Sequence, residues 1–404
     1  MSDEPRNMVE ILNDLAAQDP AIVELLGGRE RFEETKQSIS KNDTHFQERG
    51  GVFFEIGKSP MDTAQAFTEI HVEQHRESGR PSLPALVAHH LDDIGLSQDS
   101  PHYKAAILVA ARAEIDLAVT PEYHNTNHFA DVTAHVATLM KHNNNLAAQG
   151  VEGAVMMTKE EIADSITAAV GHDLGHPGGK NALPGQAPGE FDYYRLEEQA
   201  FQAMVPLMKE AGLPQKSIDE IHTMILTTSP DGPHGILKDV MRAHHSGNGV
   251  KWEDIKGHEK FPELKVLADN PRLAERAAIL EDSDLGGSAF EGLQSNVHMS
   301  KVLTEEVQNR GYKNKAGAPE DLNGDFARKM FGQFVVQDGP ASLAARDALG
   351  PNWDKLMVDT EQLLASVMED MKPDSKFAAS AKDAPAASTG TPKQKAPGIG
   401  KNSL

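Results

Sequence analysis

The stretch Ala169–Asn181, AVGHDLGHPGGKN, decides how this chain folds and where its chemistry lies. An apolar helical run ends here in His172 and Asp173, and His176 follows directly with a proline and two glycines. Because the residues before them are apolar, we expect His172 and Asp173 to emerge from the protein interior. A carboxylate there is costly unless a cation or hydrogen bonds compensate it. The stretch therefore predicts a metal site at the end of a buried helix.

The alternative interpretation of this stretch is purely structural. A histidine in the last turn of a helix is favoured by the helix dipole, and glycine and proline commonly end helices. Glycines also let the chain turn sharply, as a loop around a site would require. Further ligands elsewhere in the chain are needed to favour the metal site.

Composition limits the class of protein. The chain has 404 residues, enough for one large domain or two ordinary ones. It has no apolar run long enough for a transmembrane helix and no signal-peptide pattern at its acidic N-terminus. The absence of cysteine excludes disulfides and thiolate metal sites and fits a reducing compartment. We expect a cytoplasmic protein.

The charge of the chain argues against two kinds of partner. The formal net charge is −22, so nucleic acid and anionic membranes are repelled at long range. A small anionic substrate would still need a locally positive site, which a bound metal can supply.

Helical periodicity runs through nearly the whole chain and predicts an all-α fold. Capping boxes are expected at Thr158 with Glu161 and at Ser217 with Glu220, and a helix start at Pro271. Further helices are expected over 61–78 and 353–371. Three regions are predicted: an N-terminal helical region (1–100), a catalytic domain (101–372) and a disordered, Ala/Ser/Pro/Gly/Lys-rich tail (373–404).

Two other stretches supply candidate ligands. In PEYHNTNHFADVTAHV, His124 and His128 are four residues apart and share one face if the stretch is helical. In AAILEDSDLGGS, an apolar run delivers Asp282 and Asp284 just before a double glycine. For Asp282, an ordinary surface acid is the better interpretation. The remaining histidine pairs, such as His244 with His245, are expected to lie outside the site.

The pattern of His128, His172-Asp173 and a distant aspartate resembles that of the HD-domain metal-dependent phosphohydrolases. YHNTNHFADV resembles the YHNxxHAxDV motif of class I 3′,5′-cyclic nucleotide phosphodiesterases, and HDLGHPGGKN resembles their HDxxHPGxxN motif. DYYRLE, IHTMILTT and ILEDSDLGG follow in the order of the family's later segments. The resemblance covers about residues 100–365.

The resemblance implies a two-metal centre. His128, His172, Asp173 and Asp284 would bind a tight ion, by the family's pattern zinc, and Asp173 would bridge to a second ion, magnesium or manganese. Histidine and carboxylate ligands suit a zinc-like ion, and oxygen ligands suit magnesium or manganese.

The resemblance also implies the remaining roles. His124 would donate a proton to the leaving oxygen, and Glu197 would orient it. The purine-clamping glutamine of the family has two candidates in this chain, Gln333 and Gln337. The sequence around each of them differs from the family's context. The residues expected to line the pocket or hold its loops are Tyr123, His176, Asn181, Gln333 and Gln337.

The sequence therefore predicts a metal-dependent phosphodiesterase that hydrolyses a 3′,5′-cyclic nucleotide, cAMP or cGMP, to the 5′-monophosphate. One alternative is an HD-domain phosphohydrolase that acts on another nucleotide phosphoester. The other is a non-catalytic regulator that binds metal or nucleotide. The expected partner is a small cyclic nucleotide.

Overall fold

A computed structural model gives the structure of the chain. It describes residues 7–48, 56–57, 62, 66, 82–115, 121–186, 192–230, 234–247, 249–284, 293–314, 317–320 and 339–350. These residues belong to one compact unit, Met1–Met357, and a second unit, Val358–Leu404, lies outside the described residues. Also outside them lie Gln333, Gln337, the helix expected over 353–371, the tail, and nearly all of the helix expected over 61–78.

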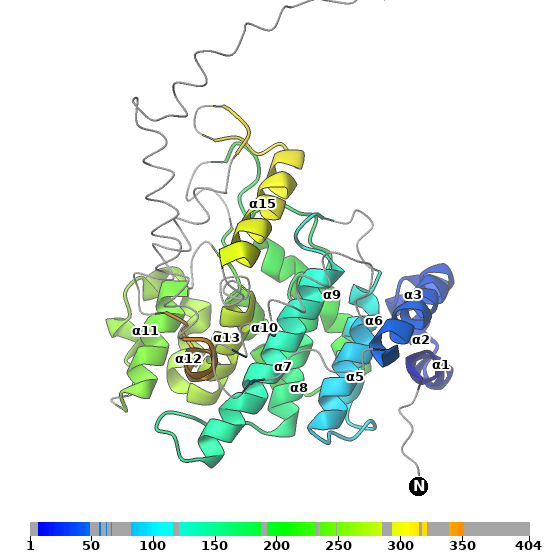
Figure 1. The fold of residues 1–404 in the computed structure, drawn as a ribbon, viewed down its shortest axis with the longest axis horizontal. Coiled ribbons are helices and arrows are strands. Elements are labelled where there is room, and N and C mark those ends of the chain that lie inside the picture. The colour runs from blue at the N-terminus through cyan, green and yellow to red at the C-terminus, as the bar shows by residue number, and fades with distance from the viewer. Residues whose placement is uncertain are drawn as a thin grey trace, which may run out of the picture. The chain divides into compact units, whose positions relative to one another are not determined.

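The described elements are helices, which confirms the predicted all-α fold (Figure 1). An isolated bridge between Lys313 and Pro319 is the only extended pairing in the described part of the chain. The longer helices are α1 (Met8–Gln18), α3 (Gly28–Glu48), α5 (Leu83–Asp93), α6 (Pro101–Ala113), α7 (Thr126–Ala148), α8 (Lys159–Gly171), α9 (Arg195–Glu210), α10 (Gln215–Leu226), α11 (His234–His245), α13 (Pro271–Asp284) and α15 (Leu293–Asn309). The shorter ones are α2 (Ala21–Leu25), α12 (Val266–Asp269) and the 3-10 turns η1 (Trp252–Asp254), η2 (His258–Lys260) and η3 (Pro262–Lys265).

Helix starts follow the sequence signals with one exception. Helix α8 begins with the expected capping box, in which Thr158 and Glu161 each accept from the other's backbone N–H. Helix α13 begins at Pro271. The capping box expected at Ser217 is wrong: the helix cap is Pro214, three residues earlier, so α10 begins at Gln215 and Ser217 lies within it. The carboxylate of Glu220 instead accepts from the buried guanidinium of Arg276.

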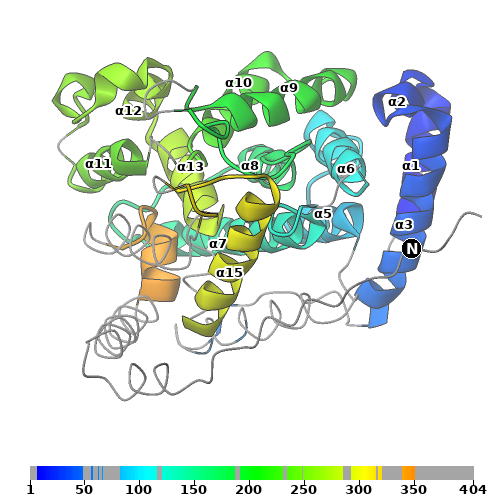
Figure 2. The same ribbon diagram turned by 90° about the horizontal axis from the view of Figure 1, so that it is seen from above.

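Helix α8 lies at the centre of the fold. Every residue from Ile162 to Gly171 is buried, as expected for a helix covered on all sides. Helices α5, α6, α7, α9, α10 and α13 all pack against it (Figure 2). Its C-terminal end therefore delivers the next residues, His172 and Asp173, into the protein interior.

The N-terminal helices pack against this core. Helix α3 contacts α5, and α2 contacts α9. Glu114, 3% exposed at the end of α6, accepts from Ser38 and Asn42 of α3 and from the backbone N–H of Leu83. One buried carboxylate thus joins three segments of the chain.

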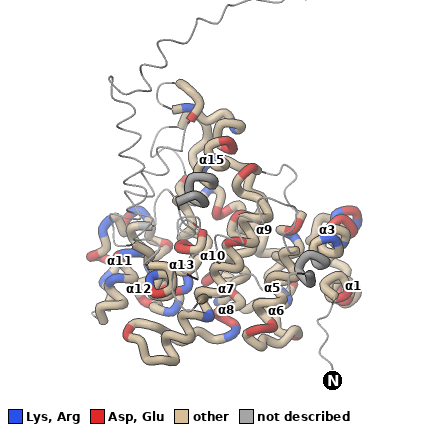
Figure 3. The backbone as a smooth tube through the Cα atoms, in the orientation of Figure 1, with Lys and Arg blue, Asp and Glu red and all other residues tan. Residues whose placement is uncertain are grey.

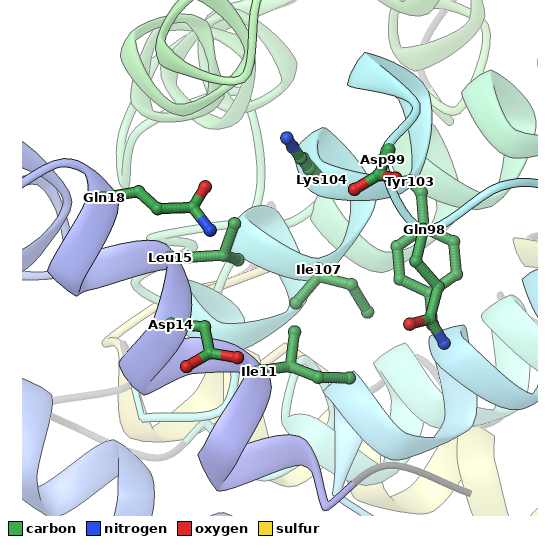
Figure 4. Close-up of a pocket in the computed structure, with 9 residues that line it drawn as sticks. All are labelled: Ile11, Asp14, Leu15, Gln18, Gln98, Asp99, Tyr103, Lys104 and Ile107. Atoms are coloured by element: carbon green, nitrogen blue, oxygen red, sulfur yellow. The ribbon is translucent and has the colours of Figure 1, made fainter.

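A small cavity lies between α1 and α6 (Figure 4). Its volume is about 70 Å³, and its lining combines apolar side chains such as Ile11 and Ile107 with polar ones such as Asp14 and Lys104. Ligand pockets for nucleotide-sized molecules occupy roughly 300–1,000 Å³. This cavity is too small to be the substrate site.

The described surface carries mixed charges. Lysines and arginines are spread over several of the described helices, with acidic residues among them (Figure 3). No described helix is both long and apolar enough to cross a lipid bilayer.

Candidate active site

Three helix ends bring the four predicted ligands together. His128 lies in the first turn of α7, where Asn125 caps the helix and accepts from the His128 backbone N–H. His172 is the C-terminal cap of α8, with Asp173 next to it, and Asp284 is the last residue of α13. His128 Nε2 lies 3.3 Å from His172 Nε2, 3.4 Å from Asp173 Oδ2 and 3.1 Å from Asp284 Oδ1. His172 Nε2 lies 3.1 Å and 3.4 Å from the same two carboxylate oxygens.

The spacing of three of these atoms, those of His128, His172 and Asp284, fits a single divalent ion, and Asp173 contacts both histidines. Ligand atoms at about 2.1 Å from a common ion lie roughly 3.0–3.4 Å from their neighbours in tetrahedral or octahedral coordination. The protonation of His172 agrees. Its Nδ1–H donates to the Ala169 carbonyl at 2.8 Å, which directs the Nε2 lone pair toward His128 and the two carboxylates. Four atoms that all accept hydrogen bonds need a cation or shared protons between them.

The pKa values of these groups report strong mutual attraction. Burial alone lowers the pKa of His128, but hydrogen bonds with Asp173 and Asp284 raise it to about 9. The two carboxylates likewise raise the pKa of His172 well above its usual value against the effect of burial. Burial raises the pKa of Asp284, and the two imidazoles more than reverse this, to about 2. Both carboxylates are therefore ionised, as metal ligands must be.

His124 lies four residues before His128, just ahead of the α7 N-cap Asn125, and pairs with a carboxylate from another part of the chain. Its Nδ1 is 2.7 Å from Glu306 Oε1, on α15. The second oxygen of Glu306 accepts from the backbone N–H groups of Tyr123, at 2.8 Å, and His124, at 3.1 Å. Burial lowers the pKa of His124, but the nearby Glu306 and Asp173 carboxylates give it a net increase.

The partner of His124 corrects an assignment made from the sequence, which gave this role to Glu197. Glu197 instead accepts from Asn181 Nδ2, at 3.0 Å. Asn181 also donates to the Tyr193 carbonyl and accepts from the Leu196 N–H, so it joins the loop before α9 to the start of that helix. Nothing in the local sequence of Glu306 distinguishes it from Glu305 beside it.

His176 packs directly on His124. The two imidazoles are stacked with centroids 3.9 Å apart and an interplanar angle of 26°. His176 Nδ1 accepts from the Gly178 N–H at 3.0 Å. Burial and the neighbouring His124 lower the pKa of His176 to about 3, so this ring is neutral. The Tyr123 ring lies against both His124 and His128, with centroids 4.8 Å from each.

The two late aspartates have separate environments. Asp284 faces the histidines, whereas Asp282 is 1% exposed and accepts from the backbone N–H groups of Ala341 and Ser342, both at 2.8 Å. The interpretation of Asp282 as a surface acid is therefore wrong. His244 and His245 form the last turn of α11, where His244 contacts the Leu267 carbonyl and His245 contacts Glu275.

The comparisons with known proteins agree with the fold and the motifs. Residues 123–316 match the family model of the 3′,5′-cyclic nucleotide phosphodiesterases. The phosphodiesterase domain of Salpingoeca rosetta rhodopsin phosphodiesterase has a similar fold, with a TM-score of 0.50 and 16% identity over 80% of this chain and 95% of that chain.

Two further solved structures are similar at lower scores. The phosphodiesterase domain of the RhoPDE fusion protein from the choanoflagellate Salpingoeca rosetta has a TM-score of 0.49 and 17% identity, over 80% of this chain and 99% of that chain. The yeast caPDE2 structure has a TM-score of 0.48 and 14% identity, over 89% of this chain and 76% of that chain. No curated protein sequence gives a significant match.

The described helices group histidines and aspartates that could hold metal ions, and the family whose model residues 123–316 match is metal-dependent. The chain belongs to the class I 3′,5′-cyclic nucleotide phosphodiesterase family, and its reaction is hydrolysis of a cyclic nucleotide phosphodiester.

Proposed function

We propose that this phosphodiesterase cleaves the P–O3′ bond of cAMP or cGMP at a two-metal centre, with His124 as the general acid. The observation that carries the proposal is the placement of three ligand atoms, from His172, Asp173 and Asp284, within 3.1–3.4 Å of His128 Nε2, four residues along the chain from His124 and its partner Glu306.

The donor set supports zinc at the tight site, held by His128, His172, Asp173 and Asp284. Two imidazoles and two carboxylates suit a zinc-like ion, whereas the second site, shared through Asp173, suits magnesium or manganese with mainly oxygen ligands. Bound ions of this kind polarise the phosphate and lower the pKa of water toward neutrality.

The chain's own residues handle the leaving group. When a water oxygen bonds to phosphorus, the water releases one proton to solvent, the P–O3′ bond breaks and its electron pair stays on O3′. His124 donates its proton to that oxygen, which leaves the 3′-hydroxyl and the 5′-monophosphate. Glu306 keeps the imidazole ring of His124 in place through Nδ1 and favours its protonated form.

The role of His124 is tested by His124→Asn on two substrates. A positioned general acid contributes about 10²–10⁴-fold in rate, so turnover of cAMP and cGMP should fall by that factor. Turnover of bis(p-nitrophenyl) phosphate should fall much less, because p-nitrophenolate leaves without a proton. Metal content, measured by elemental analysis, should be unchanged.

The matched control is His222→Asn. His222 is a partly exposed histidine on α10 that pairs with Glu198, and its loss should leave both activities near wild type. If His124→Asn releases metal or slows both substrates equally, His124 is not the general acid. Turnover of a panel of other phosphoesters by the metal-loaded protein would reveal a different natural substrate.

A further inference from the structure

The chain just after α15 folds back over the loop that carries His176. Arg310 Nε donates to the Pro177 carbonyl at 2.7 Å. The Tyr312 hydroxyl accepts from the Lys180 N–H at 3.1 Å and lies 3.2 Å from the Lys180 carbonyl, to which it donates. We call Arg310 and Tyr312 the clasp. Together they hold the backbone of the loop on both sides of its two glycines.

The two glycines fit the clasp closely. Gly178 and Gly179 have φ values of +82° and +102°, in the region that favours glycine. A Cβ on Gly178 would lie 2.8 Å from the Arg310 guanidinium, and one on Gly179 would lie 2.8 Å from the Tyr312 ring. The loop therefore needs glycine at both positions for backbone conformation and for contact with the clasp.

The loop held by the clasp contacts the general acid and its partner directly. His176 stacks on His124, and the Gly179 N–H donates to Glu306 Oε1 at 3.0 Å. The same Glu306 oxygen contacts His124 Nδ1. Loop position and acid geometry are therefore linked through shared contacts.

The clasp also ties α15 to the segment that precedes His124. Arg310 Nη1 lies 3.5 Å from Glu122 Oε2, and Asn309 Nδ2 donates to Glu122 Oε1 at 2.5 Å. Glu306 is only four residues before Arg310, about one helical turn. These contacts hold the carboxylate of Glu306 so that it reaches His124 from a fixed direction. Tyr312 is 8% exposed, so its hydroxyl is largely protected from competing water.

We propose that Arg310 and Tyr312 are positioning residues for the general acid: by holding the 176–180 loop against the end of α15, they fix His176 and Glu306 around His124. This inference rests on the proposed function of His124. It assigns the clasp a role in proton donation to the leaving group and none in metal binding.

Tyr312→Phe tests the inference because it keeps the packed ring and removes the hydroxyl. Two hydrogen bonds to the loop are lost, and we expect kcat for cAMP or cGMP to fall about tenfold. KM should stay within about twofold, as should turnover of bis(p-nitrophenyl) phosphate, whose leaving group needs no proton. Metal content should not change.

Tyr194→Phe is the matched control. Tyr194 is 7% exposed, close to the exposure of Tyr312, and its hydroxyl has no hydrogen-bond partner among the described residues. This variant should retain wild-type kcat for both substrates. Gly179→Ala provides a second test, because the added methyl group pushes against the Tyr312 ring, and it should give the same substrate-selective loss.

Two results would overturn the inference: an unchanged kcat in Tyr312→Phe, or an equal loss on both substrates. His124→Asn, measured alongside, separates this outcome from failure of the proposed function. If His124→Asn shows the leaving-group dependence and Tyr312→Phe does not, only the clasp is wrong. If His124→Asn lacks that dependence, the role of His124 itself is wrong. Should Gly179→Ala fail to fold, Tyr312→Phe still decides.

Discussion

Arg276→Met should lower the free energy of unfolding by about 3–5 kcal/mol, the usual cost of removing one partner from a buried ion pair. Arg276 is 1% exposed, and its guanidinium donates to Glu220 Oε2 at 2.6 Å and to Ser165 Oγ at 3.0 Å. Asp164 Oδ2 lies 3.7 Å away. Methionine keeps most of the apolar volume but leaves two carboxylates without their buried cation.

The position of this cluster explains why it matters for the active site. Asp164 lies eight residues before His172 on α8, and Arg276 lies eight residues before Asp284 on α13. Eight residues of α-helix span about 12 Å. The pair of Arg276 with Asp164 therefore holds α13 against α8. It does so at about the same distance along each helix from the ligand that the helix supplies.

Urea unfolding at pH 7, followed by circular dichroism, measures the effect. The control is Arg272→Met, one turn earlier on the same helix. Its side chain is 38% exposed and pairs with Glu161, and exposed pairs contribute only about 0–1 kcal/mol. The denaturant midpoint of Arg276→Met should fall far more than that of Arg272→Met.

The pH dependence provides a second check. Burial raises the pKa of Glu220, but Lys216 and Arg276 more than reverse this and give it a net decrease from 4.5. A folded-state pKa below the unfolded value adds stability above the unfolded pKa, and this is lost as pH falls through the folded pKa. The stability difference between wild type and Arg276→Met should therefore narrow below about pH 4.5. A difference that is constant with pH, or an equal loss in Arg272→Met, would refute the ion-pair explanation.

Three further predictions concern other residues. Asp284→Ala should lose the tightly bound metal in elemental analysis while Asp282→Ala keeps it, and the reverse result would move the late ligand by two residues. Glu306→Gln should keep its metal but lose about 10²–10⁴-fold in cyclic nucleotide turnover. The glutamine amide has only one accepting oxygen, so it cannot accept all of the hydrogen bonds that the two carboxylate oxygens accept. Wild-type turnover would contradict this prediction. Burial lowers the pKa of His90 to about 3, so the free energy of unfolding should fall by up to about 1.4 kcal/mol per pH unit from this residue as pH drops below 6.5 toward 3. In His90→Gln, the free energy of unfolding measured in urea should decline less steeply on the acid side. An unchanged slope of that free energy with pH would argue against this prediction.

The sequence was most informative where function depends on short-range patterns. His172 and Asp173 stand out because an apolar helix ends in polar ligand types, and His124 and His128 because they are four residues apart, although α7 begins only at Thr126 and His124 lies ahead of it. These features survive folding because α7 and α8 are long, strongly patterned helices whose ends the local sequence determines. Three of the four predicted ligands, His128, His172 and Asp284, consequently form one close group, and Asp173 contacts both histidines.

The sequence was least informative where a side chain's role depends on a distant segment. Glu306 contacts His124 across 182 positions of sequence, and its own neighbourhood, TEEVQNR, reads as an ordinary exposed helix. Glu220 has the correct spacing for a capping box with Ser217, but the buried Arg276 offers its carboxylate a stronger partner than a backbone N–H. Local spacing cannot anticipate competition from a residue that folding brings in.

The division of the site between α13 and α15 also has an evolutionary consequence. The candidate metal ligands come from α7, the C-terminal end of α8 and α13, while the partner of the proposed proton donor comes from α15. Metal binding and proton donation can therefore be lost separately. A descendant of this chain with a substitution at Glu306 would still bind ions and its nucleotide but cleave it far more slowly, and so would act mainly as a receptor for the ligand that its ancestor destroyed.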